Sequence, residues 1–272
     1  MKSLFFALIV YIVLFTSCAN PPQYNDPIPT HDSLSIMSVA LNENRVINVW
    51  TPDTYKNSTD SFPVLYMPDG GVKEDFPHIA NSLAQLIASK KIKPIILVGI
   101  ENTERRRDLS GPTTIAKDKE IAPIVGGAEN FRKFINDELF VEINKKYRTN
   151  NTKGIIGESL AGLFVTETFL LYPDMFDFYI AFDPSLWWND QLLIKTAKDH
   201  LSKFPDSQKT FWFAGSSAED ISENVAKLAE AITTTNVPNV KWQYSNETNE
   251  KHNTIFRATK EKALIWTLQA HD

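Results

Sequence analysis

The chain of 272 residues has only one cysteine, Cys18, so it cannot form an intrachain disulfide. It also lacks an excess of positive charge, because its 28 Lys and Arg residues are interspersed among 33 Asp and Glu residues and the net charge is −5. This balance gives no electrostatic footprint for nucleic acid. No group of His, Asp and Glu has the spacing of metal ligands. We therefore expect no nucleic-acid partner, no metal and no cofactor.

Long hydrophobic runs are scarce as well. The N-terminal run, Leu4 to Phe15, is too short for a comfortable membrane span, and Lys2 precedes it, which is typical of a secretion signal. The step Leu14-Phe15-Thr16-Ser17-Cys18 resembles a bacterial lipobox, in which the cysteine is diacylated and becomes the new N-terminus. An ordinary signal peptide cleaved nearby, or a short membrane anchor, is the alternative interpretation.

These features predict three segments. Residues 1–17 are a lipoprotein signal peptide, and residues 18–34, rich in Pro, Asn and Asp, are a flexible tether attached to lipid such as palmitate. Residues 35–272 are long enough for one enzyme-sized domain. In enterobacterial lipoproteins, an aspartate directly after the lipidated cysteine favours retention in the inner membrane. No aspartate follows Cys18 directly, so the outer membrane is favoured. We expect the domain to lie on the periplasmic side of that membrane, and exposure on the cell surface is left open.

Hydrophobic patterning predicts strands that alternate with helices. Apolar runs indicate strands at 46–50, 62–67, 94–100, 154–157, 178–182, 210–214 and 240–244. Helical spacing of apolar residues indicates helices at 79–89, 131–147, 160–172, 222–233 and 253–270. This order predicts an α/β fold with a mostly parallel central sheet and helices on both faces, the first strand being antiparallel. Ligands in such folds bind beyond the carboxyl ends of the strands.

The stretch Gly154 to Gly162 is the most informative part of the chain. A short β-branched run leads into Gly157-Glu158-Ser159-Leu160-Ala161, and a helical pattern follows directly. An α/β-hydrolase exposes its nucleophilic serine on such a strand-to-helix turn, with small residues on either side. Ser159 is therefore the candidate nucleophile, and Ala161 with Gly162 fills the second small position.

A serine nucleophile needs a histidine base and an acid that orients it, in the chain order Ser, acid, His. His252 is the candidate base, because it alone follows the serine in a polar loop between the last strand and the last helix. Glu219 is the favoured acid, since it follows the strand at 210–214. Asp220 and Glu223 are alternatives, as is a backbone carbonyl, and all three acids also suit a helix N-terminus.

The oxyanion formed during acyl transfer needs backbone N–H donors. We expect one from Leu160, at the N-terminus of the helix after the nucleophile, and the other from Gly70 or Gly71 in the turn after the strand at 62–67. Trp187, near the predicted mouth of the site, is expected to stack on the substrate, with packing above the sheet as the alternative.

Four segments together resemble the putative-esterase branch of the α/β-hydrolases, related to esterase D and to the enterochelin- and salmochelin-type siderophore esterases. They are Val64-Leu65-Tyr66-Met67-Pro68-Asp69-Gly70, the stretch from Ile96 to Leu109 with Asn102-Thr103-Glu104-Arg105-Arg106-Arg107-Asp108, Gly157 to Phe164, and Phe182-Asp183-Pro184-Ser185-Leu186-Trp187-Trp188. The resemblance implies ester hydrolysis through an acyl-enzyme, with Ser159 and His252 in the family's roles. The family often has Gly at Ala161, and a His-Gly/Ser-Ser sequence where this chain has His252-Asn253-Thr254.

The leading hypothesis is a lipid-anchored serine esterase of the cell envelope. Its expected substrate is a small-molecule or oligosaccharide ester, either a siderophore ester or an acylated polysaccharide. The alternative is a binding lipoprotein that keeps the hydrolase fold without turnover.

Overall fold

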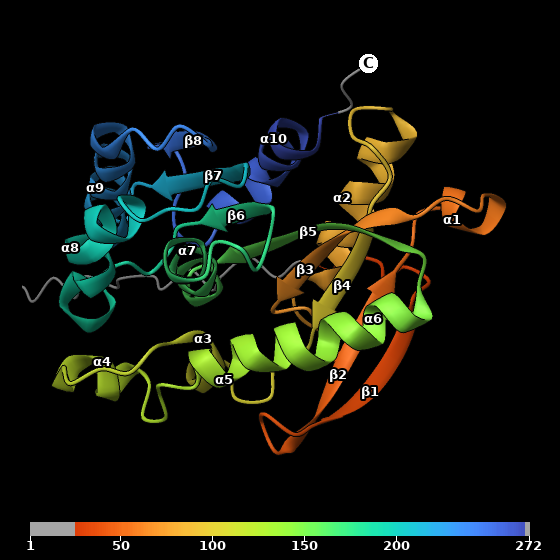
Figure 1. Cartoon of the computed structure of the whole chain (residues 1–272), viewed down its shortest axis with the longest axis horizontal. Coiled ribbons are helices and arrows are strands. Elements are labelled where there is room, and N and C mark those ends of the chain that lie inside the picture. Colours follow the sequence, from red (N-terminus) through yellow and green to blue (C-terminus); the bar gives the residue numbers. More distant parts are fainter. Residues whose placement is uncertain (1–24, 270–272) are drawn as a thin grey trace, which may run out of the picture.

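The computed structural model describes residues 25–269 and arranges them around one eight-stranded sheet (Figure 1). The strand order is β1-β2-β4-β3-β5-β6-β7-β8, with β2 antiparallel to both β1 and β4 and every other pair parallel. This topology confirms the predicted α/β-hydrolase fold. The strands are β1 (Asp32–Ser38), β2 (Glu43–Trp50), β3 (Phe62–Pro68), β4 (Ile96–Ile100), β5 (Thr149–Glu158), β6 (Phe178–Phe182), β7 (Lys209–Ser216) and β8 (Val240–Glu247).

Helices connect the strands and cover both faces of the sheet (Figure 1). They are α1 (Thr54–Asn57), α2 (Phe76–Ala88), α3 (Arg105–Leu109), α4 (Ala116–Ile121), α5 (Ala128–Lys133), α6 (Phe140–Lys146), α7 (Leu160–Leu171), α8 (Trp188–Leu201), α9 (Glu219–Thr235) and α10 (Ile255–Leu268). The single helix expected at 131–147 is α5 and α6 joined by a π-helical segment, Phe134–Leu139.

Side chains alternate along the central strands and build a separate core on each face of the sheet. On β3, Val64 and Tyr66 belong to one cluster, whereas Leu65 and Met67 belong to the other. Helices α5 to α9 cover the first core, and α2 and α10 cover the second. The strand after which Ser159 lies is therefore buried on both faces.

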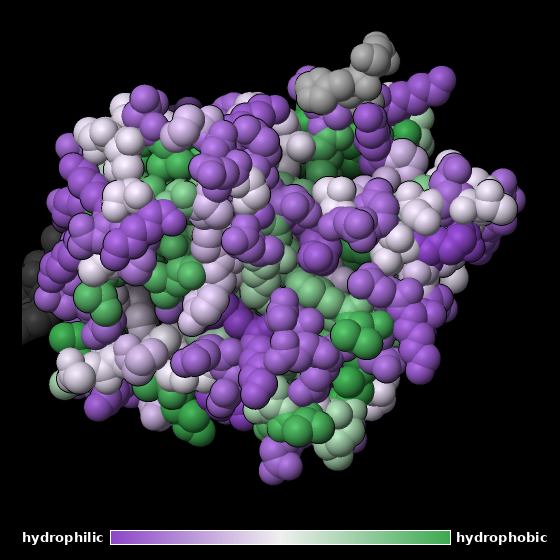
Figure 2. Space-filling view, in the orientation of Figure 1, coloured by the Kyte–Doolittle hydropathy of each residue, from purple (hydrophilic) through white to green (hydrophobic). Residues whose placement is uncertain are grey.

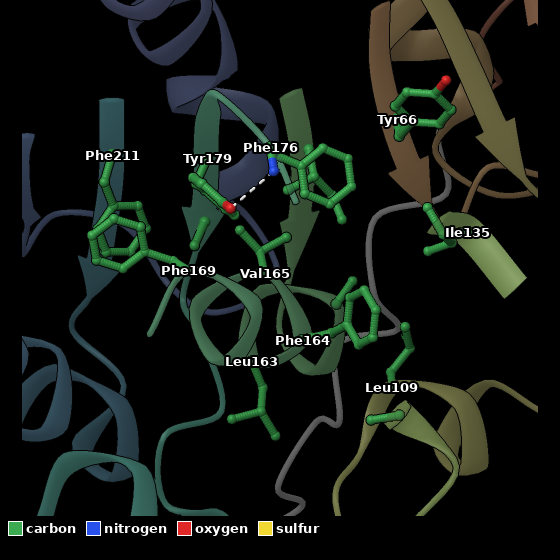
Figure 3. Packing of buried hydrophobic residues seen from close by; sticks show 14 of the residues in the cluster. Tyr66, Leu109, Ile135, Leu163, Phe164, Val165, Phe169, Phe176, Tyr179 and Phe211 are labelled. Atoms are coloured by element: carbon green, nitrogen blue, oxygen red, sulfur yellow. Dashed lines mark hydrogen bonds between the residues drawn. The ribbon is translucent and has the colours of Figure 1, made fainter. Parts of the chain in front are cut away.

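Helix α7 is held most firmly, because ten of its twelve residues are buried. Figure 3 shows its apolar side chains, with Phe169 packed against aromatic residues from β6 and β7. Phe169 stacks on Phe211 with ring centroids 4.3 Å apart. A polar handle adds to this packing, since the buried Tyr179 hydroxyl accepts a hydrogen bond from the Phe176 N–H at 3.1 Å.

The start of the domain differs from the expected boundary. Residues 32–34, predicted as tether, belong to β1, where Asp32 pairs with Val49 of β2. The proposed signal peptide and Cys18 lie outside the described residues. Within residues 25–269, no helix is both long and apolar enough to cross a membrane. The face in Figure 2 is mostly polar, with apolar residues in small separate patches.

A buried ion-pair network fixes the loop after β4 to β2. The Arg45 guanidinium is fully buried and donates to Asp108 Oδ2 at 2.6 Å, to Glu43 Oε1 at 2.8 Å and to the Glu101 carbonyl at 3.2 Å. Arg107 donates to the other Asp108 oxygen at 2.7 Å. The Asp108 side chain is only 1% exposed, so each charge depends on the other for compensation.

Asp108→Ala is expected to lower the free energy of unfolding by about 3–5 kcal/mol, because the Arg45 charge stays buried while its Asp108 partner is removed. Chemical denaturation followed by circular dichroism measures this loss. Asp137→Ala, at an exposed carboxylate, serves as the control and should change stability by about 0.5 kcal/mol or less. A loss below about 1 kcal/mol for Asp108→Ala would contradict the assigned role of this pair.

Candidate active site

Ser159 lies on a strained turn between β5 and α7. Its φ of 61° and ψ of −118° fall where non-glycine residues are rare. Gly157 permits the turn, because a Cβ there would lie 2.7 Å from the backbone of Ala161. The methyl group of Ala161, at the position where glycine is often found, fits because Gly157 has no side chain. The predicted strand-turn-helix arrangement around the serine is therefore present.

His252 joins Ser159 in a hydrogen-bonded chain of three side chains. It lies between β8 and α10, with Nε2 3.1 Å from Ser159 Oγ and Nδ1 3.0 Å from Asp183 Oδ2. This geometry fits an imidazole with its proton on Nδ1, donating to the carboxylate while Nε2 accepts from the serine hydroxyl. The predicted pairing of Ser159 with His252 is thus what the structure contains.

Asp183, and not the predicted Glu219, is the carboxylate that is hydrogen-bonded to His252. It follows β6 directly with a φ of 41°, and its side chain is fully buried. The backbone N–H of Ser216 donates to Asp183 Oδ1 at 2.5 Å, and the Ser216 hydroxyl donates to Oδ2 at 2.6 Å. The end of β7 therefore holds the carboxylate toward the imidazole.

The three acids expected after β7 lie elsewhere. Glu219 and Asp220 are exposed in the first turn of α9, where negative charge favours the helix N-terminus, and Glu223 pairs with Lys227 at 2.7 Å. The correction follows from topology, since β6 lies between β5 and β7 and brings Asp183 nearer to the serine turn. The sequence signal was Phe182-Asp183-Pro184, an acid directly after a buried strand.

The surroundings shift two pKa values at the site. The hydrogen bond to Asp183 raises the pKa of His252 against the opposing effect of burial, and Glu158 adds to the rise from 3.8 Å away. Burial raises the pKa of Glu158 to about 7, because its side chain is only 19% exposed. Glu158 therefore titrates near neutral pH beside Ser159, and His252 keeps its proton to a higher pH than a free imidazole does.

The two predicted oxyanion donors differ in availability. Leu160 is the first residue of α7, so its N–H has no helical acceptor, and no acceptor for it is found within residues 25–269. The Gly70 N–H is already donated to the Ile100 carbonyl at 2.9 Å, which corrects its assignment as a donor. Gly71, the alternative, donates to the Glu74 carboxylate at 2.7 Å, so its N–H becomes free only if that side chain turns away.

Gly70 is instead required for close packing. A Cβ on Gly70 would lie 2.3 Å from the Cα of Gly99 on β4. Around it, Arg105 donates to both oxygens of Asp69 at 2.6 and 2.8 Å, and Asn102 donates to Asp69 and to Glu74. This network fixes the turn after β3 beside the site. Arg105 therefore has a structural role, because it holds Asp69 in this turn.

A cavity of about 820 Å³ lies beside the imidazole. His252 and Glu158 form part of its wall, together with the stretch from Val72 to Pro77 at the start of α2 and with Phe256 and Arg257 of α10. Residues 25–28 line a further part of the wall. Among the described residues, no three His, Cys, Asp or Glu side chains are grouped as metal ligands would be.

Residues 38–269 match the family described as "Putative esterase". The chain belongs to this family. The match covers strands β2 to β8, reaches only the last residue of β1, and includes all three residues of the hydrogen-bonded chain.

Several relatives of this esterase family member have names that refer to siderophores. It is 28% identical over 258 residues to the ferri-bacillibactin esterase BesA of Bacillus subtilis, covering 85% of this chain and 88% of that protein. Its fold is similar to that of an IroE-like serine hydrolase from Shewanella oneidensis, with a TM-score of 0.80, 24% identity and coverage of 87% and 79%. It is also similar to the siderophore hydrolase EstB from Aspergillus nidulans, with a TM-score of 0.73, 18% identity and coverage of 91% and 98%.

Trp187 in this esterase packs against the first core, and its expected stacking on the substrate stays a prediction. Its half-buried ring lies against the first core and against Trp188, with ring centroids 5.9 Å apart. The Trp188 indole N–H donates to the Gly111 carbonyl at 3.1 Å. The described residues that line the cavity beside His252 do not include Trp187.

Asp183→Asn is expected to lower the pKa of His252, because the hydrogen bond to Asp183 is the main cause of its rise. A raised pKa keeps the imidazole protonated to higher pH, so the neutral form appears as the pH increases through that pKa. Titration of the imidazole signals by NMR measures the midpoint. Glu219→Gln is the control and should leave the midpoint unchanged. A midpoint that is lowered by Glu219→Gln and not by Asp183→Asn would indicate that Glu219 on α9 is the acid.

Proposed function

We propose that this chain is a serine esterase that hydrolyses carboxylic esters through an acyl-enzyme. Ser159 is the nucleophile, His252 the general base and Asp183 the acid that orients the imidazole. One observation carries the proposal: the continuous chain from Ser159 Oγ to His252 to Asp183, with hydrogen bonds of 3.1 and 3.0 Å.

The geometry supports the following sequence of steps. His252 Nε2 takes the proton of the Ser159 hydroxyl while Oγ bonds to the ester carbonyl carbon, and the carbonyl electron pair moves onto oxygen. The Leu160 N–H stabilises that oxyanion. When the electron pair returns, the bond to the alcohol breaks and the imidazolium gives its proton to the departing oxygen. Water, deprotonated by His252, then bonds to the acyl carbon. The bond from that carbon to Oγ breaks, the carboxylic acid leaves, and the imidazolium returns its proton to Ser159 Oγ.

Asp183 acts without becoming protonated. It accepts the Nδ1–H of His252 and stabilises the imidazolium that forms in each half-reaction. Its hydrogen bonds from Ser216 fix the carboxylate before substrate arrives, so no reorganisation is needed during the reaction. An inactive binding protein would have no physical need for this buried acid, which makes the alternative of a non-catalytic lipoprotein less well supported.

We propose siderophore esters as the substrate class. The support comes from relatives named for such esters, BesA above all, and from a cavity of about 820 Å³ beside His252. A cavity of that size suits a substrate much larger than a simple acetate. No observation of comparable weight favours acylated polysaccharides.

We also propose that the enzyme is anchored to the cell envelope through lipid on Cys18. The support is the sequence alone, namely the apolar run Leu4 to Phe15 and the single cysteine that follows it.

Ser159→Ala should reduce hydrolysis of p-nitrophenyl acetate and butyrate by at least about 10³-fold, because no other hydroxyl among residues 25–269 is hydrogen-bonded to His252. Initial rates of the parent and the variant measure the loss. Glu219→Gln is the control and should stay within about twofold of the parent. Equal rates for the parent and Ser159→Ala would exclude Ser159 as the nucleophile, and no hydrolysis by either would favour the binding-protein alternative.

Cys18→Ser should abolish incorporation of an alkyne-tagged palmitate and release the chain from the membrane fraction of the expressing cells. Gel fluorescence after labelling, with fractionation, measures both effects. Ser17→Ala tests the specificity of any change, and we expect it to leave labelling in place. Labelling that persists in Cys18→Ser would contradict the anchor.

A further inference from the structure

The cavity beside His252 has a wall that does not come from the sheet or its helices. Residues Asn25–Ile28, here named the N-terminal strap, precede β1 and line the cavity that also contains His252 and Glu158. A Pro-rich segment without apolar periodicity is expected to be a linker. Its place in the wall beside the imidazole instead gives these residues access to whatever binds there.

Two helices hold the N-terminal strap in place. The Arg257 guanidinium on α10 donates to both carboxylate oxygens of Asp26, at 2.5 and 3.1 Å. The Asn81 amide on α2 donates to the Pro27 carbonyl at 2.8 Å. A bidentate Arg–carboxylate pair fixes orientation as well as distance. The strap is therefore positioned against both helices of the second core.

The strap presents apolar surface to the cavity. Ile28 lines the cavity and is 58% exposed, and Asn25 and Pro27 are exposed as well. Apolar side chains gain free energy when a ligand removes them from water. A small ester would occupy only the space next to Ser159, whereas a ligand that fills the cavity would contact Ile28.

We propose that the N-terminal strap is a specificity-determining wall, which binds the bulky part of a siderophore-type ester and is positioned by the Asp26–Arg257 pair. This inference rests on the proposed function, because it deepens the substrate class of the same site. The strap takes no part in the bond-making steps, which belong to Ser159, His252 and Asp183. Its loss therefore weakens binding of large esters and leaves hydrolysis of small ones intact.

The test measures binding and turnover separately on the full chain. Calorimetry on a Ser159→Ala background gives the Kd of iron-free enterobactin, a cyclic triester that cannot be hydrolysed there. Kinetics on the Ser159 enzyme give kcat/KM for p-nitrophenyl acetate. Asp26→Asn breaks the ion pair and Ile28→Ala removes the apolar contact. Asp26→Glu keeps the pair, and Ile124→Ala is the matched control at an isoleucine 55% exposed away from the cavity wall.

Asp26→Asn and Ile28→Ala should each raise the Kd about fivefold to tenfold, as expected when part of one apolar contact is lost. Asp26→Glu and Ile124→Ala should stay within about twofold of the parent. All four variants should keep kcat/KM for p-nitrophenyl acetate within about twofold.

An unchanged or lower Kd in both strap variants would overturn the inference, as would failure of the parent background to bind the triester. A parallel fall in kcat/KM for p-nitrophenyl acetate would also overturn it, because it would mean that the strap supports the catalytic residues themselves. Failure of the proposed function has a different signature: the Ser159 enzyme would not hydrolyse p-nitrophenyl acetate at all, whatever the Kd values.

Discussion

The strained backbone at Ser159 is the constraint on which the rest of the site depends. A positive φ at a serine costs about 1–3 kcal/mol, so the neighbouring structure must hold it there. The end of β6 does so twice: the Ser159 N–H donates to the Phe182 carbonyl at 3.0 Å, and the Ser185 N–H donates to the Ser159 carbonyl at 3.1 Å. Asp183 lies between these two braces. The segment that fixes Ser159 therefore also supplies the carboxylate that is hydrogen-bonded to His252.

Much of this arrangement can be predicted from the sequence, because it is encoded locally. Apolar runs locate the strands, and Gly157-Glu158-Ser159 lies where a buried strand leads directly into an apolar helix. His252 follows from chain order and its loop. The acid cannot be predicted in this way, since Asp183 and Glu219 both obey the order Ser, acid, His and both follow a strand. Only burial against Ser216 separates them, and that depends on how β6 and β7 lie side by side.

The other departures share this non-local origin. The role of Gly70 is decided by the Ile100 carbonyl and by Gly99, both on a strand that follows more than 25 residues later. Residues 25–31 have no apolar periodicity. Hydrogen bonds from α2 and α10 to Pro27 and Asp26 hold this segment in place. Sequence patterns predict the helices and strands. Single hydrogen bonds between residues far apart in the sequence become visible only in the folded structure.

The position of the N-terminal strap has a geometric consequence for an enzyme with lipid on Cys18. Six residues, Ala19 to Tyr24, separate that cysteine from Asn25 in the cavity wall, and the seven Cα steps from Cys18 to Asn25 span at most about 25 Å when extended. The cavity beside His252 would then remain within about one domain's width of the bilayer. Such an enzyme would sample substrate from the thin layer of solvent next to the membrane, so encounter would depend on transport across that surface more than on diffusion through the bulk.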